Sequence, residues 1–261
     1  MSDHWVLKLK HTHKASYRNL KLFIGILGMA LPLILVVGGL AYPDHSVQPS
    51  ISNYYHTHLQ DVLVAVLATA SVLFMSYVGY SWVDDLLTWL VGIAGIGVIL
   101  FPCPMNPQTA APVGVFQLPQ GTSGNVHYAS AALFFVLLAV NAIFLFTATD
   151  QPRMGPAKRA RNVVYDVCGG LILACVAALG IARLSHVSLE NSYLTLILEW
   201  VMLWAFGVSW LVKADIGILP DAMDARRAAA PPPPAKAAKA AKAARPAKKA
   251  AKKAPAKRGR R

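Results

Sequence analysis

Six long apolar runs constrain this chain more than any other feature of its sequence. A helix needs about 20 apolar residues to cross the hydrocarbon core of a bilayer. With 56% hydrophobic and only 14% charged residues, the composition is also too apolar for an ordinary soluble domain. The runs cover residues 20–41, 62–83, 86–102, 126–148, 163–184 and 193–212. The sequence therefore predicts an all-α fold, a six-helix transmembrane bundle within residues 20–215.

The third apolar run is the shortest, and it contains Gly92, Gly95 and Gly97. Small residues in a span let two helix backbones approach each other closely. These glycines therefore predict close helix contacts along the third span. Asp84 and Asp85, which stand between the second and third runs, are interpreted as a tight cytoplasmic turn.

The basic residues are distributed very unevenly along the chain. Of its 25 Lys and Arg residues, 24 fall in residues 1–21, 153–161 or 213–261, and the loops 42–60 and 103–125 contain none. Positive charge accumulates in the cytoplasmic loops of membrane proteins. We therefore expect both the N-terminus and the C-terminus to be cytoplasmic and the two uncharged loops to face the other side of the membrane.

Two basic segments flank the predicted bundle. Residues 1–19 form a basic cytoplasmic N-terminus, and residues 216–261 form a tail that becomes rich in Ala, Pro and Lys from Ala228 onward. Such a tail has little apolar surface to bury, and its like charges repel, so we expect it to be disordered. Its candidate partners are anionic lipid headgroups, which attract basic segments at the membrane surface, or nucleic acid.

The densest polar stretch, residues 49–61, lies on the non-cytoplasmic side, just before the second span. It contains Ser52, His56 and Asp61. Spans two, four and six all start on this side, so topology places Asp61 at a depth similar to those of His127 and Glu199. Ionisable groups within a membrane are rare and usually mark a functional site. We therefore predict an outer polar site with five candidate catalytic residues: Ser52, His56, Asp61, His127 and Glu199.

Two kinds of chemistry fit these residues. His56, His127 and Glu199 are candidate ligands for a divalent metal such as zinc, which can activate a bound water. Alternatively, Ser52 and a nearby imidazole can act as nucleophile and base, or Ser52 can donate a hydrogen bond in the transition state. A purely structural role, in which these polar groups hold helices together, remains an equal alternative. Asn141 falls on the same helical face as His127, which predicts an inward polar stripe on the fourth span.

The segments Pro49-Ser50-Ile51-Ser52, His127–Ala131 and Leu198-Glu199-Trp200 together resemble a known family. In order and spacing they are similar to the six-span damage-regulated autophagy modulators and GPI-anchor remodelling proteins, and most closely to uncharacterised bacterial members of this type. The resemblance implies an integral protein of a bacterial inner membrane. A fainter similarity links Ser52 and His56 to the alkaline ceramidase and adipoQ receptor superfamily of intramembrane zinc amide hydrolases. The paired histidines of that superfamily's last span are absent here, where Glu199 stands, which argues against zinc amidase activity.

The sequence favours a membrane protein with an outer-leaflet polar pocket that binds, hydrolyses or remodels a lipid. The alternative is a non-catalytic membrane scaffold or sensor whose basic tail binds anionic lipid or nucleic acid. The residues leave open whether the chain is an enzyme.

Overall fold

The computed structural model describes residues 3–41, 47–79, 81–105, 109–148, 155–187, 189 and 192–215, with side chains from Ser16 onward. The predicted basic tail, residues 216–261, lies outside the described residues. The described part is helical, and its extended pairing is limited to one bridge between Val113 and Leu118. The α-helices are α1 (Asp3–Ala41), α2 (Gln60–Met75), α3 (Trp82–Leu100), α4 (Gln120–Val140), α5 (Pro156–Leu184) and α6 (Leu194–Lys213). A short 3₁₀ helix, η1 (Ser52–His56), precedes α2, and a π-helical turn, η2 (Asn141–Leu145), continues α4.

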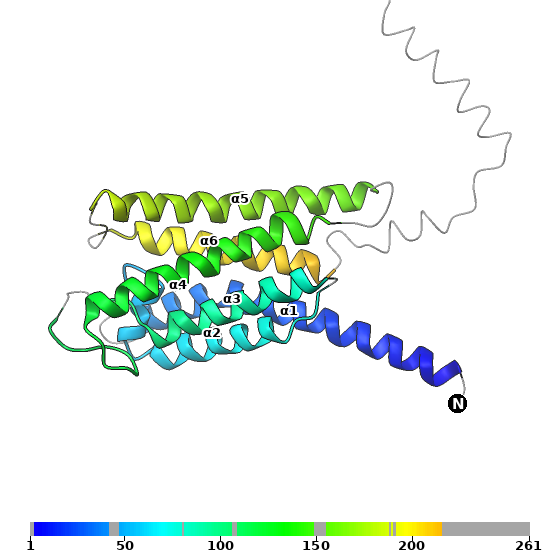
Figure 1. Cartoon of the computed structure of the whole chain (residues 1–261), viewed down its shortest axis with the longest axis horizontal. Coiled ribbons are helices and arrows are strands. Elements are labelled where there is room, and N and C mark those ends of the chain that lie inside the picture. The colour runs from blue at the N-terminus through cyan, green and yellow to red at the C-terminus, as the bar shows by residue number, and fades with distance from the viewer. Residues whose placement is uncertain are drawn as a thin grey trace, which may run out of the picture. The chain divides into compact units, whose positions relative to one another are not determined.

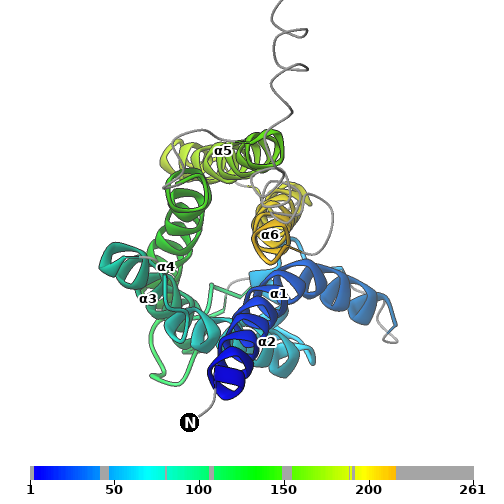
Figure 2. The same cartoon turned by 90° about the vertical axis from the view of Figure 1, so that its right-hand side faces the viewer.

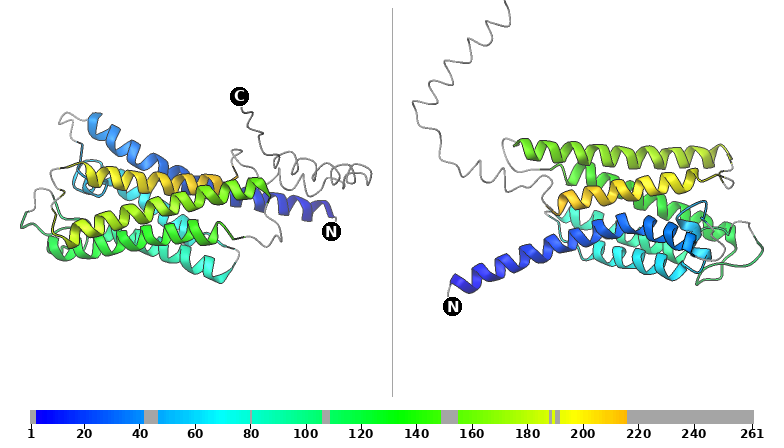
Figure 3. Two further views of the ribbon diagram at one scale, coloured as in Figure 1. Left: turned by 90° about the horizontal axis from the view of Figure 1, so that it is seen from above. Right: turned by 180° about the vertical axis from the view of Figure 1, so that it is seen from behind.

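The six helices run alongside one another and form a closed ring (Figures 1 and 2). Each helix packs against its neighbours in the sequence, and α6 returns to pack against α1. Because the connections alternate between the two ends, α1, α3 and α5 begin at one end, where α2, α4 and α6 finish. The first turns of α1 extend beyond the other helices at that end (Figures 1 and 3). The order of elements along the chain is thus also their order around the bundle.

Five of the six helices are long and apolar enough to cross a membrane, which supports an integral membrane protein. The exception is α2, an apolar helix of 16 residues. The predicted second span, 62–83, was wrong at its end because the helix stops at Met75 although the sequence stays largely apolar. Ser81 starts α3 through a capping box, in which the Asp84 backbone N–H donates to Ser81 and the Ser81 N–H donates to Asp84.

The first turn of α3 also corrects the interpretation of the aspartates. Asp84 and Asp85 belong to the helix itself, where their charge suits its N-terminus, and Gly79 N–H donates to Asp85 Oδ1 at 2.5 Å. The close contacts predicted for the glycines are confirmed. An added Cβ at Gly92 would lie 2.6 Å from the backbone oxygen of Ser71 in α2, and one at Gly97 would lie 2.6 Å from Ser130 Oγ in α4.

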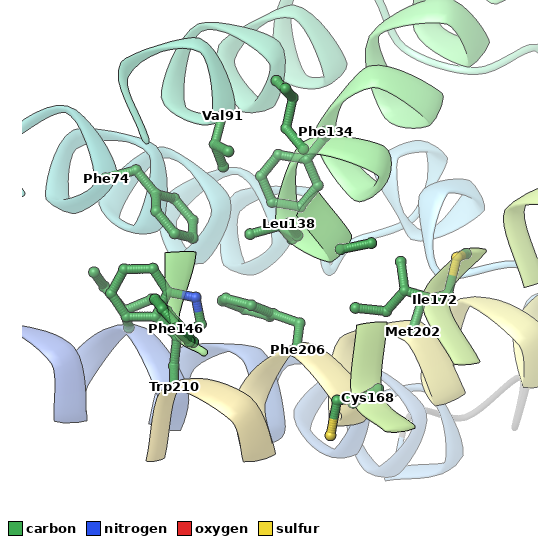
Figure 4. Close-up of a cluster of buried hydrophobic side chains, with 14 of the residues drawn as sticks. Phe74, Val91, Phe134, Leu138, Phe146, Cys168, Ile172, Met202, Phe206 and Trp210 are labelled. Carbon is green, nitrogen blue, oxygen red and sulfur yellow. The ribbon is translucent and has the colours of Figure 1, made fainter. Parts of the chain in front are cut away.

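The core at the end where α6 finishes is aromatic. Trp210 of α6 is 1% exposed, and its ring centroid lies 5.2 to 5.3 Å from those of Phe74, Tyr77 and Phe146. Phe206, one turn earlier, lies beside it (Figure 4). Edge-to-face contacts of this kind add stability beyond simple burial. This aromatic cluster joins α2, α6 and the end of α4 into one packed unit.

Asn141 faces the interior, as the polar stripe on the fourth span predicted. Its side chain is 1% exposed and has no hydrogen-bond partner among the described residues, and it opens the π-helical turn that continues α4. The Phe146 N–H donates to the Asn141 carbonyl five residues earlier, which is the π-helical pattern. The extra residue of this turn changes which face of the helix carries Phe146, and Phe146 is thereby placed against Trp210.

Candidate functional site

The segment before α2 folds back against the start of α6. The Leu196 backbone N–H donates to the Pro49 carbonyl at 2.9 Å, and the side chains of Ile51 and Tyr54 are buried. Within the loop, the Asn53 N–H donates to Ser50 Oγ at 3.0 Å, which steadies the entry into η1. The motif Pro49–Ser52 is therefore held in place at both ends, so that Ser52 lies inside the bundle.

Glu199, on α6, accepts hydrogen bonds from this loop. The Ile51 N–H donates to Glu199 Oε2 at 2.6 Å, and Ser52 Oγ lies 3.5 Å from Oε1. An N–H at the start of a helical turn has no partner within that turn, and a carboxylate is a strong acceptor for it. Glu199 thus completes the hydrogen bonding of the loop from a different helix.

His127, on α4, donates a hydrogen bond to the backbone at the end of α3. Its Nδ1–H donates to the Phe101 carbonyl at 2.9 Å, with the Val98 carbonyl at 3.3 Å. The last carbonyls of a helix lack partners within it, and Pro102 prevents the helix from continuing. His127 is 3% exposed, so the imidazole satisfies these carbonyls in a buried position where water does not reach them readily.

Ser52 joins the two side chains, because its Oγ lies 3.1 Å from His127 Nε2. Since carbonyl oxygens accept the proton on Nδ1, the neutral ring presents Nε2 as an acceptor. The Ser52 hydroxyl has one proton to donate, and its shorter contact is with His127 rather than Glu199. The arrangement is a serine with a histidine base on one side and a carboxylate on the other.

These three side chains form the polar end of a cavity of about 650 Å³, including its open mouth. The cavity lies between α1, α2, α3, α4 and α6, and Tyr55 adds a further polar group. The remaining walls are apolar and include Leu31, Leu63, Leu67, Val98, Ile99, Ala131, Phe134, Phe135 and Leu203. Apolar walls with a few convergent polar groups are typical of small-molecule sites.

The structure brings together three of the five candidate residues, namely Ser52, His127 and Glu199. His56 lies beside them but points its Nε2–H to the Cys103 carbonyl at 2.7 Å, so it helps to fix the loop. Asp61 is exposed in the first turn of α2 and does not line the cavity. Asp61 lies at a depth similar to that of the cavity residues, but it is on the face of α2 that points away from the interior.

The geometry does not fit the proposed metal ligands. Among the described residues, no group of three or more His, Cys, Asp or Glu side chains is placed to hold a metal ion. Both ring nitrogens of His127 already have partners, and His56 Nε2 faces a carbonyl oxygen. His56, His127 and Glu199 are therefore better explained by hydrogen bonding than by zinc coordination.

Two residues that the sequence did not point to, Cys103 and Tyr54, stabilise the loop that carries Ser52. Cys103 Sγ donates to Asn53 Oδ1 at 3.1 Å, and burial raises the pKa of the Cys103 thiol, which keeps it protonated at neutral pH. Tyr54 is fully buried, and burial raises the pKa of its hydroxyl. The carbonyls of Phe101 and Cys103 are backbone groups that any residue supplies, so no sequence signal marked them.

In comparisons with known proteins, no family model, no curated protein and no solved structure matches this chain.

Proposed function

We propose that the bundle binds an amphipathic lipid in this cavity. The headgroup would meet Ser52, His127 and Glu199, and an acyl chain would lie along the apolar walls. The observation that carries the proposal is the composition of the cavity, whose hydrogen-bonding groups are confined to one end. A soluble polar substrate would leave most of these walls without favourable contacts, whereas a lipid covers them and reaches the site from the bilayer.

The topology of the membrane belongs to the same proposal. We propose six crossings with both termini cytoplasmic in a bacterial inner membrane, so that the cavity opens toward the outer leaflet. The uneven distribution of Lys and Arg supports this orientation. A membrane-impermeant maleimide should label Val115→Cys, an exposed loop position, from outside the cell. It should label Arg159→Cys only after permeabilisation, and the opposite pattern would invert the orientation.

Lipid binding can be tested with a photo-crosslinkable single-chain lipid in nanodiscs. Cross-links should map to cavity-lining peptides, and Leu203→Trp, which fills the cavity, should lower the yield several-fold. Ile197→Trp is the matched control, because this residue lies on the same helix but is 55% exposed, whereas Leu203 is 6% exposed. Equal yields from both variants would contradict binding in the cavity.

Acyl transfer is a second candidate function, and the contact between Ser52 and His127 favours it. Ser52 Oγ would attack an acyl carbonyl while His127 Nε2 takes its proton, and His127 would then protonate the leaving group. Water would then attack the acyl–Ser52 ester while His127 Nε2 takes its proton, and Ser52 Oγ would leave and recover a proton from His127. Ser52→Ala should abolish turnover of an acyl-ester lipid and preserve cross-linking. Unchanged turnover in Ser52→Ala would rule out this role and leave binding as the function.

A further inference from the structure

An aromatic side chain closes the inner end of the cavity. Phe134 of α4 lines the cavity and is 4% exposed. Its ring centroid lies 6.1 Å from that of Phe74, which packs edge-to-face against Trp210 (Figure 4). Helix α3 also comes so close that a Cβ added at Gly95 would lie 3.3 Å from the Phe134 ring. The ring of Phe134 therefore forms the floor of the cavity and rests on the aromatic core.

The other helices around the cavity close it at the same level. One turn farther inward, each contributes a buried residue that does not line the cavity: Gly28 of α1, Ser71 of α2, Gly95 of α3, Leu138 of α4 and Phe206 of α6. These residues leave little space between them. A Cβ added at Gly28 would meet the Phe206 ring, and one added at Gly95 would meet Ser71 Oγ. The cavity is therefore blind at its inner end.

The depth of the cavity limits the length of an acyl chain within it. His127 at the polar end and Phe134 at the floor are separated by about two helical turns, or about 10 Å along the axis of α4. One leaflet of a bilayer has a hydrocarbon layer of about 15 Å, which chains of about sixteen carbons fill. A chain that starts at the polar end therefore reaches the floor after about ten carbons.

The bilayer around the protein makes this limit selective. Lipid tails are as apolar as the cavity walls, so a methylene group gains little by moving from the bilayer into the cavity. A chain that is too long pushes against the packed floor, and overpacking of this kind is costly. A chain that is too short leaves wall atoms without contacts. Fit, rather than hydrophobicity, therefore decides which chain length binds best.

The polar end restricts the headgroup. The residues described as lining the cavity include the carboxylate of Glu199 but no Lys or Arg, and the loops 42–60 and 103–125 contain none either. A phosphate there would face a carboxylate without a lining cation to neutralise it, whereas a hydroxyl group can donate to Glu199 or His127. We propose that the cavity selects a lipid with an uncharged, hydroxyl-bearing headgroup and one acyl chain of about ten carbons, and that Phe134 sets this length. This inference rests on the lipid binding proposed above.

The proposal can be tested by letting monoacylglycerols compete with the photo-crosslinkable lipid for the full chain in nanodiscs. Hexanoyl, decanoyl and palmitoyl glycerol are compared at equal mole fraction in the bilayer, and decanoyl should compete about tenfold better than palmitoyl. Ala131→Leu raises the floor by about one turn, so the ratio of decanoyl to hexanoyl competition should fall about tenfold. Ala132→Leu adds the same atoms at an exposed position of α4 and should change this ratio less than about twofold.

Removing the floor should have the opposite effect. Phe134→Ala should raise the ratio of palmitoyl to decanoyl competition about fivefold, and Phe144→Ala, at a position that is 65% exposed, should leave it unchanged. If Phe134→Ala loses its helical circular dichroism, Phe134→Leu replaces it, with Phe144→Leu as its control, and a rise of at least about twofold is then expected.

Three results would overturn the proposal. Competition that increases up to palmitoyl glycerol, with equal ratios in Ala131→Leu and Ala132→Leu, would refute the length limit while lipid binding stands. Equal competition by decanoyl lysophosphatidic acid and decanoyl glycerol would refute the selection of an uncharged headgroup. Absence of competition at every chain length, together with cross-links outside the cavity, would refute lipid binding in the cavity and this inference with it.

Discussion

The inward face of α6 carries a carboxylate near one end and an indole near the other. Glu199, Leu203, Phe206 and Trp210 recur at helical spacing, so all four point into the ring. Around Trp210, rings from several helices pack directly against one another. Around Glu199, hydrogen bonds hold the loop and a cavity lies beside them. The two ends therefore have different roles: aromatic packing at one end stabilises the bundle, and this stability allows the polar end to keep an open space.

The largest effect should come from removing the indole. Trp210→Ala should lower the free energy of unfolding by about 3–5 kcal/mol, because the surrounding rings cannot close so large a gap. Denaturant titration of the protein in detergent, followed by circular dichroism, measures this loss. Trp204→Ala is the control, because Trp204 lies on the same helix but is 38% exposed. A loss below 1 kcal/mol in Trp210→Ala would place the stability of the bundle elsewhere.

Removing the carboxylate at the other end should have a smaller effect on stability and a local effect on structure. Glu199→Ala leaves the Ile51 N–H without its acceptor, at a cost of about 1–3 kcal/mol. Glu199→Gln keeps an oxygen acceptor and should retain most of that stability. Hydrogen exchange should therefore quicken at residues 50–56 in the alanine variant while the residues around Trp210 stay protected. Uniform loss of protection would show that the two ends are not separable.

The helical architecture was readable from the sequence, but its boundaries were not all readable. The apolar runs located every helix because a bilayer demands length and hydrophobicity together. The second apolar run did not predict where α2 ends, because residues 77–83 stay largely apolar although Ser81 and Asp84 begin a new helix. Local capping chemistry overrode hydropathy there, and the spacing of Ser81 and Asp84 was a signal that could have revealed it.

The sequence pointed to the main side chains of the site but not to the hydrogen bonds that join them. Alternating topology placed His127 and Glu199 at one depth, and the structure joins both to Ser52. The same reasoning included Asp61, because depth along a span says nothing about which face a residue occupies. Donors and acceptors from the backbone, such as Ile51 N–H and the Phe101 carbonyl, fix the geometry and depend on tertiary structure alone.

Two glycines of α3 extend the comparison to helix packing. Gly92→Ala pushes a methyl group against the Ser71 backbone oxygen and should cost about 1–3 kcal/mol, because the backbones must move apart. Gly97→Ala meets the Ser130 hydroxyl, which can rotate away, and Ser130 Cβ at 3.1 Å, which has to move by only a few tenths of an ångström, so its cost should stay below about 1 kcal/mol. Thermal unfolding in detergent compares them. Gly170→Ala is the control and should be neutral or slightly stabilising, because no atom of the described residues lies within 4 Å of the added methyl group. Equal costs at Gly92 and Gly97 would contradict the difference in adaptability.

The last expected effect is a pH dependence that originates at the polar end. Burial raises the pKa of the Cys103 thiol in the folded protein, so folding favours the protonated form. The resulting stability is complete below the pKa of the unfolded thiol, roughly 8.5, and is lost as the pH rises above it. Between pH 8 and 9.5 the free energy of unfolding should fall by about 1 kcal/mol in a Cys168→Ala/Cys175→Ala background, where Cys103 is the only thiol. Adding Cys103→Ala should remove this slope; a slope that persists would assign the titration to another group and leave the burial of Cys103 without an energetic consequence.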